Sequence, residues 1–197
     1  MLVVGVDPGI RGGISGLDTE KKTLWSIETP VLLVDQKKKK FDYDIHRIAA
    51  LFRAANPDLI CLEAVHSMPA QGVSSVFNFG RGFGILLGII GTLGIPLRLV
   101  TPRVWKARLG ITADKETSRI KANQVFPACK AFWKLKKHDG LCESALLSFF
   151  ALDNLPLDLI IPENIFDLYE IAENTSVRNP RPPKRTKPAK ILKIGSA

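Results

Sequence analysis

Cysteine is scarce in this chain of 197 residues, which contains only Cys61, Cys129 and Cys142. The three are odd in number, widely spaced and set in apolar surroundings, so they fit neither a disulfide framework nor the paired spacing of a zinc site. This pattern predicts a reducing, cytoplasmic compartment.

Membrane signals are also lacking. No leader peptide opens the sequence, because its first residues already form the pattern of a strand. The apolar stretch at 83–97 is rich in glycine, is interrupted by Pro96 and is too short to span a bilayer. We therefore expect no membrane partner, and the sequence contains no internal repeat.

Acidic residues are sparse where basic residues are dense. Residues 1–150 hold 21 Lys and Arg and 13 Asp and Glu, a balance of +8, and residues 98–137 hold eleven bases against two acids. Such a block indicates a polyanionic partner, with a solvated helix surface as the alternative. The basic candidates for contacts with a nucleic-acid backbone are Arg81, Arg103, Lys106, Arg108, Lys115, Arg119, Lys136 and Lys137. The run at 37–40, four lysines, is either a solvated connector or a phosphate contact.

The apolar pattern predicts one mixed α/β domain over residues 1–152. The expected strands cover 2–7, 12–17, 23–28, 59–62 and 95–100, and the expected helices cover 44–55, 79–93, 117–126 and 141–152, with a further helix opening at 101–103. Their order predicts antiparallel strands at one edge and parallel strands at the centre. Residues 153–173 hold six acids and no base, which predicts an acidic extension. Residues 174–197 hold seven bases, no acid and four prolines, which predicts a disordered basic tail.

Two of the expected strands end in an acid. Asp7 precedes a Pro-Gly turn, and Glu63 follows residues 59–62 directly. If the two strands are parallel neighbours, both carboxylates lie at the edge of the sheet where ligand sites form. A charge at the end of a buried strand is costly unless it is compensated, and a metal ion is the usual compensator. The alternative for Asp7 is a turn residue that caps its own backbone.

Two further acids open the last expected helix. Asp139 and Glu143 are four residues apart and share one helical face. Their ordinary roles would be an N-cap and a first-turn acid. Together, the four acids suit two divalent metals about 4 Å apart that hydrolyse a phosphodiester. Mg²⁺ is the default for oxygen-only ligands, with Mn²⁺ as a substitute, and no small-molecule cofactor beyond the metal is expected.

Four motifs in this order resemble those of the RuvC-like Holliday junction resolvases: Val-Val-Gly-Val-Asp7-Pro-Gly, Ile-Cys-Leu-Glu63, Thr101-Pro-Arg-Val-Trp-Lys106 and Lys-Lys-His-Asp139-Gly-Leu-Cys-Glu143. The likeness runs from residue 1 to about 151 and is nearest to the phage and chloroplast branch. It implies an RNase H-like fold with a mixed five-stranded sheet flanked by helices, a homodimer, and metal-dependent paired nicking of four-way DNA junctions. Two alternatives stay open, namely another RNase H-like nuclease on branched DNA or RNA–DNA hybrids, and a catalytically dead junction-binding protein.

The resemblance also implies roles for single residues. Asp7 corresponds to the carboxylate shared between the metals, with Glu63 beside it, and Glu143 matches the final acid of the family. Bacterial members carry an acid or a histidine three residues before that acid, where this chain has glycine, and the chloroplast branch reads Asp-His where this chain reads His138-Asp139. We favour Asp139 as the remaining ligand because it shares a helical face with Glu143, and His138 stays open as a ligand or general base.

Two further segments have counterparts in the family. The segment after Glu63 corresponds to the part that wedges an apolar side chain into the crossover, for which Met68, Phe77 and Phe79 are the candidates. Core packing is the alternative for the two phenylalanines. The glycine-rich helix that contains Gly84 and Gly88 resembles the family's dimer-forming element, and its glycines predict close backbone approach to another helix or chain.

Overall fold

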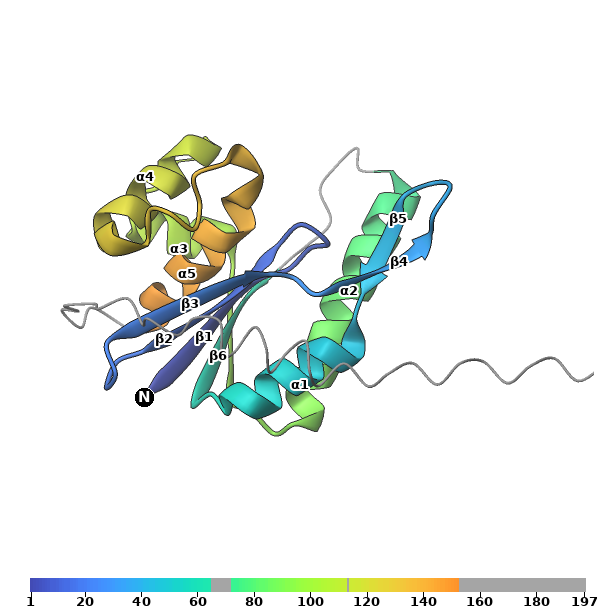
Figure 1. The fold of residues 1–197 in the computed structure, drawn as a ribbon, viewed down its shortest axis with the longest axis horizontal. Helices are drawn as coiled ribbons and strands as arrows, with labels where there is room; N and C mark the ends of the chain where they lie inside the picture. The colour runs from blue at the N-terminus through green and yellow to red at the C-terminus, as the bar shows by residue number, and fades with distance from the viewer. Residues whose placement is uncertain (65–71, 113, 153–197) are drawn as a thin grey trace, which may run out of the picture.

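The computed structural model describes residues 1–64, 72–112 and 114–152 (Figure 1). The proposed acidic extension at 153–173 and basic tail at 174–197 lie outside these residues. In chain order the elements are β1 (Leu2–Asp7), β2 (Gly13–Asp18), β3 (Thr23–Glu28), β4 (Val31–Asp35), β5 (Lys40–Tyr43), α1 (Ile45–Ala55), β6 (Leu59–Glu63), α2 (Val73–Thr92), β7 (Leu97–Val100), α3 (Pro102–Arg108), α4 (Lys115–Val125) and α5 (Asp139–Ala151). Single 3₁₀ turns form at Pro127–Cys129 and Lys136–His138.

The main sheet has five strands in the order β3-β2-β1-β6-β7. β1 pairs antiparallel with β2, and β2 with β3, whereas β1–β6 and β6–β7 are parallel. The expectation of an antiparallel edge and a parallel centre is therefore confirmed. The central strand β1 is buried along Val3–Val6, as its continuous apolar run predicts.

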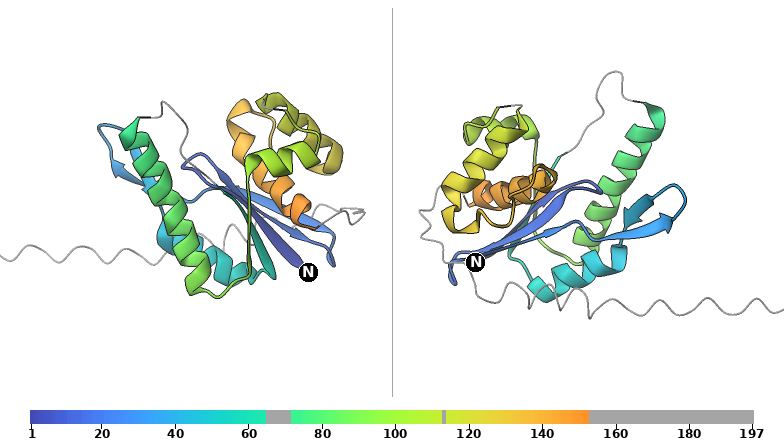
Figure 2. Two further views of the ribbon diagram at one scale, coloured as in Figure 1. Left: turned by 180° about the vertical axis from the view of Figure 1, so that it is seen from behind. Right: turned by 45° about the horizontal axis from the view of Figure 1, so that its top comes forward.

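Helices cover both faces of this sheet (Figures 1 and 2). Because side chains alternate along a strand, Val3 packs with α4 and α5 in one cluster, whereas Val4 and Val6 pack with α1 and α2 in the other. Helix α1 begins where expected, since Asp44 accepts the N–H of Arg47 at 3.0 Å as its N-cap. The result is a three-layer α/β domain with a core on each side of the sheet.

The hairpin β4–β5 was not predicted from the sequence. Three consecutive residues of β4, Leu32–Val34, are exposed, so this strand lacks the alternation that marks a half-buried strand. The lysine run indicated a loop, yet Asp35 accepts the N–H groups of Lys37 and Lys38 and closes a tight turn. Lys40 then begins β5, so the four lysines lie at the tip of the hairpin.

Helix α2 begins at Val73, six residues before its expected start, and is 20 residues long. By length and composition alone it could cross a membrane, which corrects the expectation that this stretch is too short. One such helix is a weak indication, and α2 packs against α1 and the sheet through Leu86 and Ile90. A Cβ at Gly82 would overlap the Tyr43 ring, so close approach within the chain is found there.

Candidate metal centre

Asp7 and Glu63 lie at the same edge of the sheet and on the same face. The parallel register pairs Val6 with Leu62, the residues just before them, so Asp7 and Glu63 are the next neighbours. Both belong to the set of alternate side chains that points toward α5. The two strand-end acids therefore meet as the sequence predicted.

Helix α5 brings Glu143 to this face because glycines let its backbone approach the sheet closely. A Cβ at Gly5 of β1 would overlap the carbonyl oxygen of Ser144, the residue that follows Glu143. At the start of the helix, a Cβ on Gly140 would lie 2.6 Å from the carbonyl carbon of Gly12. No side chain fits at 140, which is the position where the resemblance to bacterial resolvases leads one to expect an acid or a histidine.

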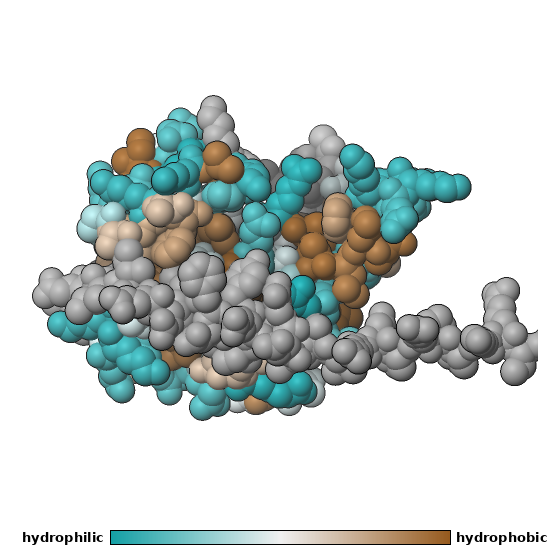
Figure 3. All heavy atoms as spheres, viewed as in Figure 1, coloured by the Kyte–Doolittle hydropathy of each residue, from teal (hydrophilic) through white to brown (hydrophobic). Residues whose placement is uncertain are grey.

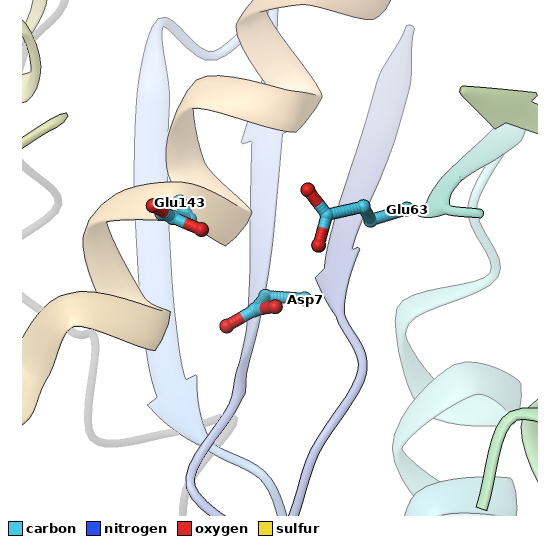
Figure 4. A group of neighbouring side chains, drawn as sticks. All are labelled: Asp7, Glu63 and Glu143. Atoms are coloured by element: carbon cyan, nitrogen blue, oxygen red, sulfur yellow. The ribbon is translucent and has the colours of Figure 1, made fainter. Parts of the chain in front are cut away.

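Three carboxylates meet as a result (Figure 4). Asp7, Glu63 and Glu143 each offer one oxygen, and these oxygens lie within 4.8 Å of one another. Oxygens on opposite sides of one Mg²⁺ lie about 4.2 Å apart, twice its usual ligand distance of about 2.1 Å. The spacing thus fits ligands of one ion or of a pair about 4 Å apart. The donor set is oxygen only, which suits Mg²⁺ or Mn²⁺.

Helix α3 holds two of the three carboxylates through consecutive residues. The indole N–H of Trp105, which is fully buried, donates to Oε1 of Glu63 at 2.8 Å. The ammonium group of Lys106 donates to Oε1 of Glu143 at 2.7 Å, and the hydroxyl of Ser118 in α4 donates to the same oxygen at 3.0 Å. These bonds orient both glutamates, and the charge of Lys106 offsets part of theirs.

Burial dominates the electrostatics of Glu63, which is 8% exposed. Loss of hydration raises the pKa of its carboxyl group, and the negative charge of Glu143 raises it further. The Trp105 N–H and the charge of Lys106 act in the opposite direction. Since a metal ion binds the deprotonated carboxylate, these two groups help to keep the site competent near neutral pH.

Trp105 and Ser118 were missed as site residues by the sequence analysis. Trp105 lies inside one of the motifs quoted above, but a tryptophan there is typical of a core residue. Trp105 and Glu63 are 42 positions apart in the chain, which hides the contact, and Ser118 is 25 positions from Glu143 on another helix. The available sequence signal was the adjacent Trp105-Lys106 pair in the motif that opens the helix after the strand at 95–100.

Among the described residues, the carboxylate cluster does not include Asp139. Helix α5 begins at Asp139 and His138 takes the N-cap position, so Asp139 is a first-turn residue rather than the N-cap. Its Oδ1 lies 3.8 Å from the guanidinium of Arg119. The buried Nδ1 of His138 has no hydrogen-bond partner within the described ranges. Metal ligation by Asp139 and a ligand or base role for His138 stay predictions.

The basic candidates differ in their exposure and in the contacts that the structure gives them. Those on the surface are Arg103, Arg108 and Lys137. Those paired with acids are Lys106, Arg119 (with Glu116 at 3.1 Å) and Arg81 (with Asp42 at 2.7 Å). The side chains of Lys115 and Lys136 lie outside the described part of the structure. Phosphate contact by any of these residues stays a prediction.

The three wedge candidates differ in exposure and in their position in the structure. Phe77, near the start of α2, is 69% exposed and packs into neither core cluster. Phe79 is half-buried and lines a cavity beside β5. Met68 lies outside the described residues. An exposed aromatic side chain at Phe77 is compatible with the predicted wedge.

No family model and no curated protein matches this sequence. Two solved structures of RuvC from Thermus thermophilus are similar in fold. One, a structure of RuvC, has a TM-score of 0.52 and 18% identity, and the other, RuvC in complex with a Holliday junction substrate, has a TM-score of 0.49 and 15% identity. Each match covers 77% of this chain and 95% of the other. Together with the mixed sheet, the likeness at a TM-score of 0.52 shows an RNase H-like fold.

Proposed function

We propose that this protein is a structure-selective endonuclease that resolves four-way (Holliday) DNA junctions by paired, metal-dependent hydrolysis. The observation that carries the proposal is the meeting of Asp7, Glu63 and Glu143 within 4.8 Å, in a chain of net charge +9. Acids that hold metals beside bases that hold DNA are the combination that such a nuclease needs. The RNase H-like fold and the four motifs support it, and the last motif supports the phage and chloroplast branch.

In this proposal two Mg²⁺ ions would activate a water molecule and stabilise charge on the phosphate that is cleaved. Asp7 ends the central strand, and one of its oxygens lies within 4.8 Å of an oxygen of each glutamate. It is therefore the residue placed to bind both ions. Trp105 and Lys106 hold the glutamates in position. Arg103 and Arg108, which are exposed on the same helix, are placed to contact the DNA backbone.

The test is a comparison of substrates with the full chain in Mg²⁺. We expect symmetric nicks in a synthetic four-way junction, and much slower cleavage of a duplex, a flap and an RNA–DNA hybrid of matched sequence. Faster cleavage of the hybrid or the flap would instead favour another RNase H-like nuclease. Tight junction binding without any cleavage would favour a junction-binding protein.

We also propose a homodimer built on α2. Gly80, Gly84, Gly88 and Gly91 recur at a spacing that places them on one face of the helix, and a Cβ on any of them would meet no atom within 4 Å in the described structure. Hydrophobic side chains gather on the surface around α2 (Figure 3). A two-fold pair would present two metal centres to two strands of a junction.

A charged side chain on this face is expected to break the dimer. Gly84→Arg should halve the mass measured by light scattering, because it places a long cation in the proposed interface. Glu28→Arg makes a larger change in charge at an exposed residue of the edge strand β3 and should leave the mass unchanged. If Gly84→Arg leaves the mass unaltered, the interface does not include this face of α2.

Trp105→Phe is expected to weaken divalent-metal binding by about 10- to 100-fold, the usual effect of losing a group that orients a ligand. The change removes the N–H that fixes Glu63 but keeps most of the buried ring. Trp133→Phe is the matched control, because Trp133 is also buried and its N–H donates to Asn123, away from the carboxylates. Mn²⁺ titration calorimetry on both variants measures the effect, and equal affinities would contradict it.

We propose a reducing compartment of the cytoplasmic kind for this protein. Cys61, Cys129 and Cys142 are buried free thiols. Burial raises the pKa of each thiol, to about 12, 11 and 12 respectively, so all three stay neutral and unreactive. Thiols of this kind support a phage, bacterial or organelle-stroma setting.

A further inference from the structure

A cavity of about 410 Å³ lies between β5, the first half of α2 and the turn that follows Asp7. Gly9 and Ile10 of that turn form one wall, and they come two and three residues after Asp7. We call this cavity the hairpin pocket. Its volume lies in the range of sites for small ligands. One wall of the cavity is therefore the turn that directly follows Asp7 in the chain.

Aromatic rings and cations line the hairpin pocket together. Phe41, Tyr43 and Phe79 supply the rings, Lys40 supplies positive charge, and Arg81, which is paired with Asp42, also lines the pocket. Phe41 is 45% exposed although it lies on a strand, so its ring offers a surface that the core does not use. Rings of this kind stack on nucleobases, and cations beside them bind the phosphates between bases.

The charge around the hairpin pocket is positive overall. Asp42 is the acid nearest in sequence to Phe41, and Arg81 neutralises it through an ion pair of 2.7 Å. The guanidinium also holds the pKa of Asp42 below its usual value. Lys37–Lys39 are exposed on the turn that leads into Lys40. A phosphate is therefore attracted to this rim, whereas a neutral or cationic ligand is not.

We propose that the hairpin pocket takes one unpaired nucleotide of the DNA strand whose phosphate reaches the metal centre. The base stacks on Phe41, and its phosphate lies on Lys40. A paired base cannot stack on a protein ring without leaving its own stack, so the pocket selects DNA that is unpaired or easily opened near the cut. This inference rests on the proposed function, because it supplies that nuclease with a preference for strand crossovers over intact duplex.

The test measures binding of short DNA without cleavage. The full chain with Asp7→Asn, in EDTA, is titrated into fluorescein-labelled pentathymidylate and into a labelled duplex of 12 base pairs. Adding Phe41→Ala is expected to weaken binding of the single strand by about 5-fold or more, because stacking on one ring is worth about 1–3 kcal/mol. Duplex binding should change less than about twofold, because its bases stay paired. Phe41→Tyr should restore the single-strand affinity.

Leu32→Ala is the matched control. Leu32 is 45% exposed on the same hairpin, like Phe41, but it does not line the pocket. It should leave both affinities unchanged, and circular dichroism verifies the fold of each variant. An equal loss for Leu32→Ala and Phe41→Ala, or none for Phe41→Ala, overturns the inference.

Two further measurements test whether the ligand is a DNA strand and whether the protein nicks junctions. Thymidine monophosphate should compete with pentathymidylate only weakly, and competition at equal concentration would overturn the assignment to a DNA strand in favour of a free nucleotide. Junction nicking by the chain without the Asp7 substitution is measured in parallel. If binding of the single strand depends on Phe41 but the protein nicks no junction, the nucleotide pocket is supported and the proposed function is refuted.

Discussion

Replacing Asp7 with Asn is expected to lower the rate of junction nicking by about 1000-fold or more, because metal ions supply several kcal/mol of transition-state stabilisation and each 1.4 kcal/mol is about tenfold in rate. Junction binding should persist or tighten, since one negative charge beside the phosphates is lost. Glu63→Gln and Glu143→Gln should behave in the same way, because all three oxygens lie within 4.8 Å. Single-turnover cleavage in Mg²⁺ and binding in Ca²⁺ measure the two effects.

Asp18→Asn is the control for this prediction. Asp18 ends β2 at the opposite end of the strands from Asp7, where its carboxylate accepts the N–H groups of Glu20 and Lys21 in a turn. It should leave nicking within about twofold of the parent rate, because a turn residue at the far end of the strands contributes little to chemistry at a remote site. Parent-like nicking by Asp7→Asn would refute the metal centre, whereas loss of junction binding would show that Asp7 supports the fold instead.

Gly5→Ala is expected to destabilise the domain by about 3 kcal/mol or more, or to prevent folding. The added methyl group would overlap the carbonyl oxygen of Ser144 and approach the backbone N of Ser148. Backbone in a packed helix cannot rotate aside as a flexible side chain can, so α5 must move off the sheet. Urea unfolding of the full chain, followed by circular dichroism, measures the loss.

Gly72→Ala is the matched control, because Gly72 precedes α2 outside the proposed glycine interface, has an ordinary extended backbone (φ −62°, ψ 140°), and a Cβ there would meet no atom within 4 Å in the described structure. The same chemical change should alter stability by less than about 1 kcal/mol, the usual size of an exchange at an N-cap position. Equal effects at the two positions would show that α5 does not need the close approach at Gly5. A folded Gly5→Ala variant should also bind metal more weakly, because Glu143 moves with α5.

Elements with strong local signals could be predicted from the sequence. β3 was predicted with its observed bounds, and α1 was predicted at 44–55, where Asp44 caps it and Asn56, in the left-handed conformation, ends it. The same reasoning failed where tertiary contacts stabilise an element. The hairpin β4–β5 has no alternation to reveal it, and the first turns of α2 contain serines and an asparagine that are typical of a loop.

Asp7 and Glu63 could be predicted as a pair because one rule, an acid at the end of an apolar strand, applied to both. Sequence spacing placed Glu143 and Asp139 on one helical face, and the resemblance assigned Glu143, but neither could decide between Asp139 and His138 as the remaining ligand. Spacing on a helix determines which residues share a face, whereas packing determines what that face meets.

The sequence by itself therefore determined the strand-end acids, the excess of positive charge and the alternation of strands and helices. Only the tertiary structure decided which groups surround the acids. The close approach at Gly5 and Gly140 brings Glu143 to Asp7, while Asp139 lies beside Arg119. The N–H of Trp105 reaches Glu63 across 42 residues of chain. Contacts of this kind depend on distances between backbones, and local patterns in a single sequence carry no information about those distances.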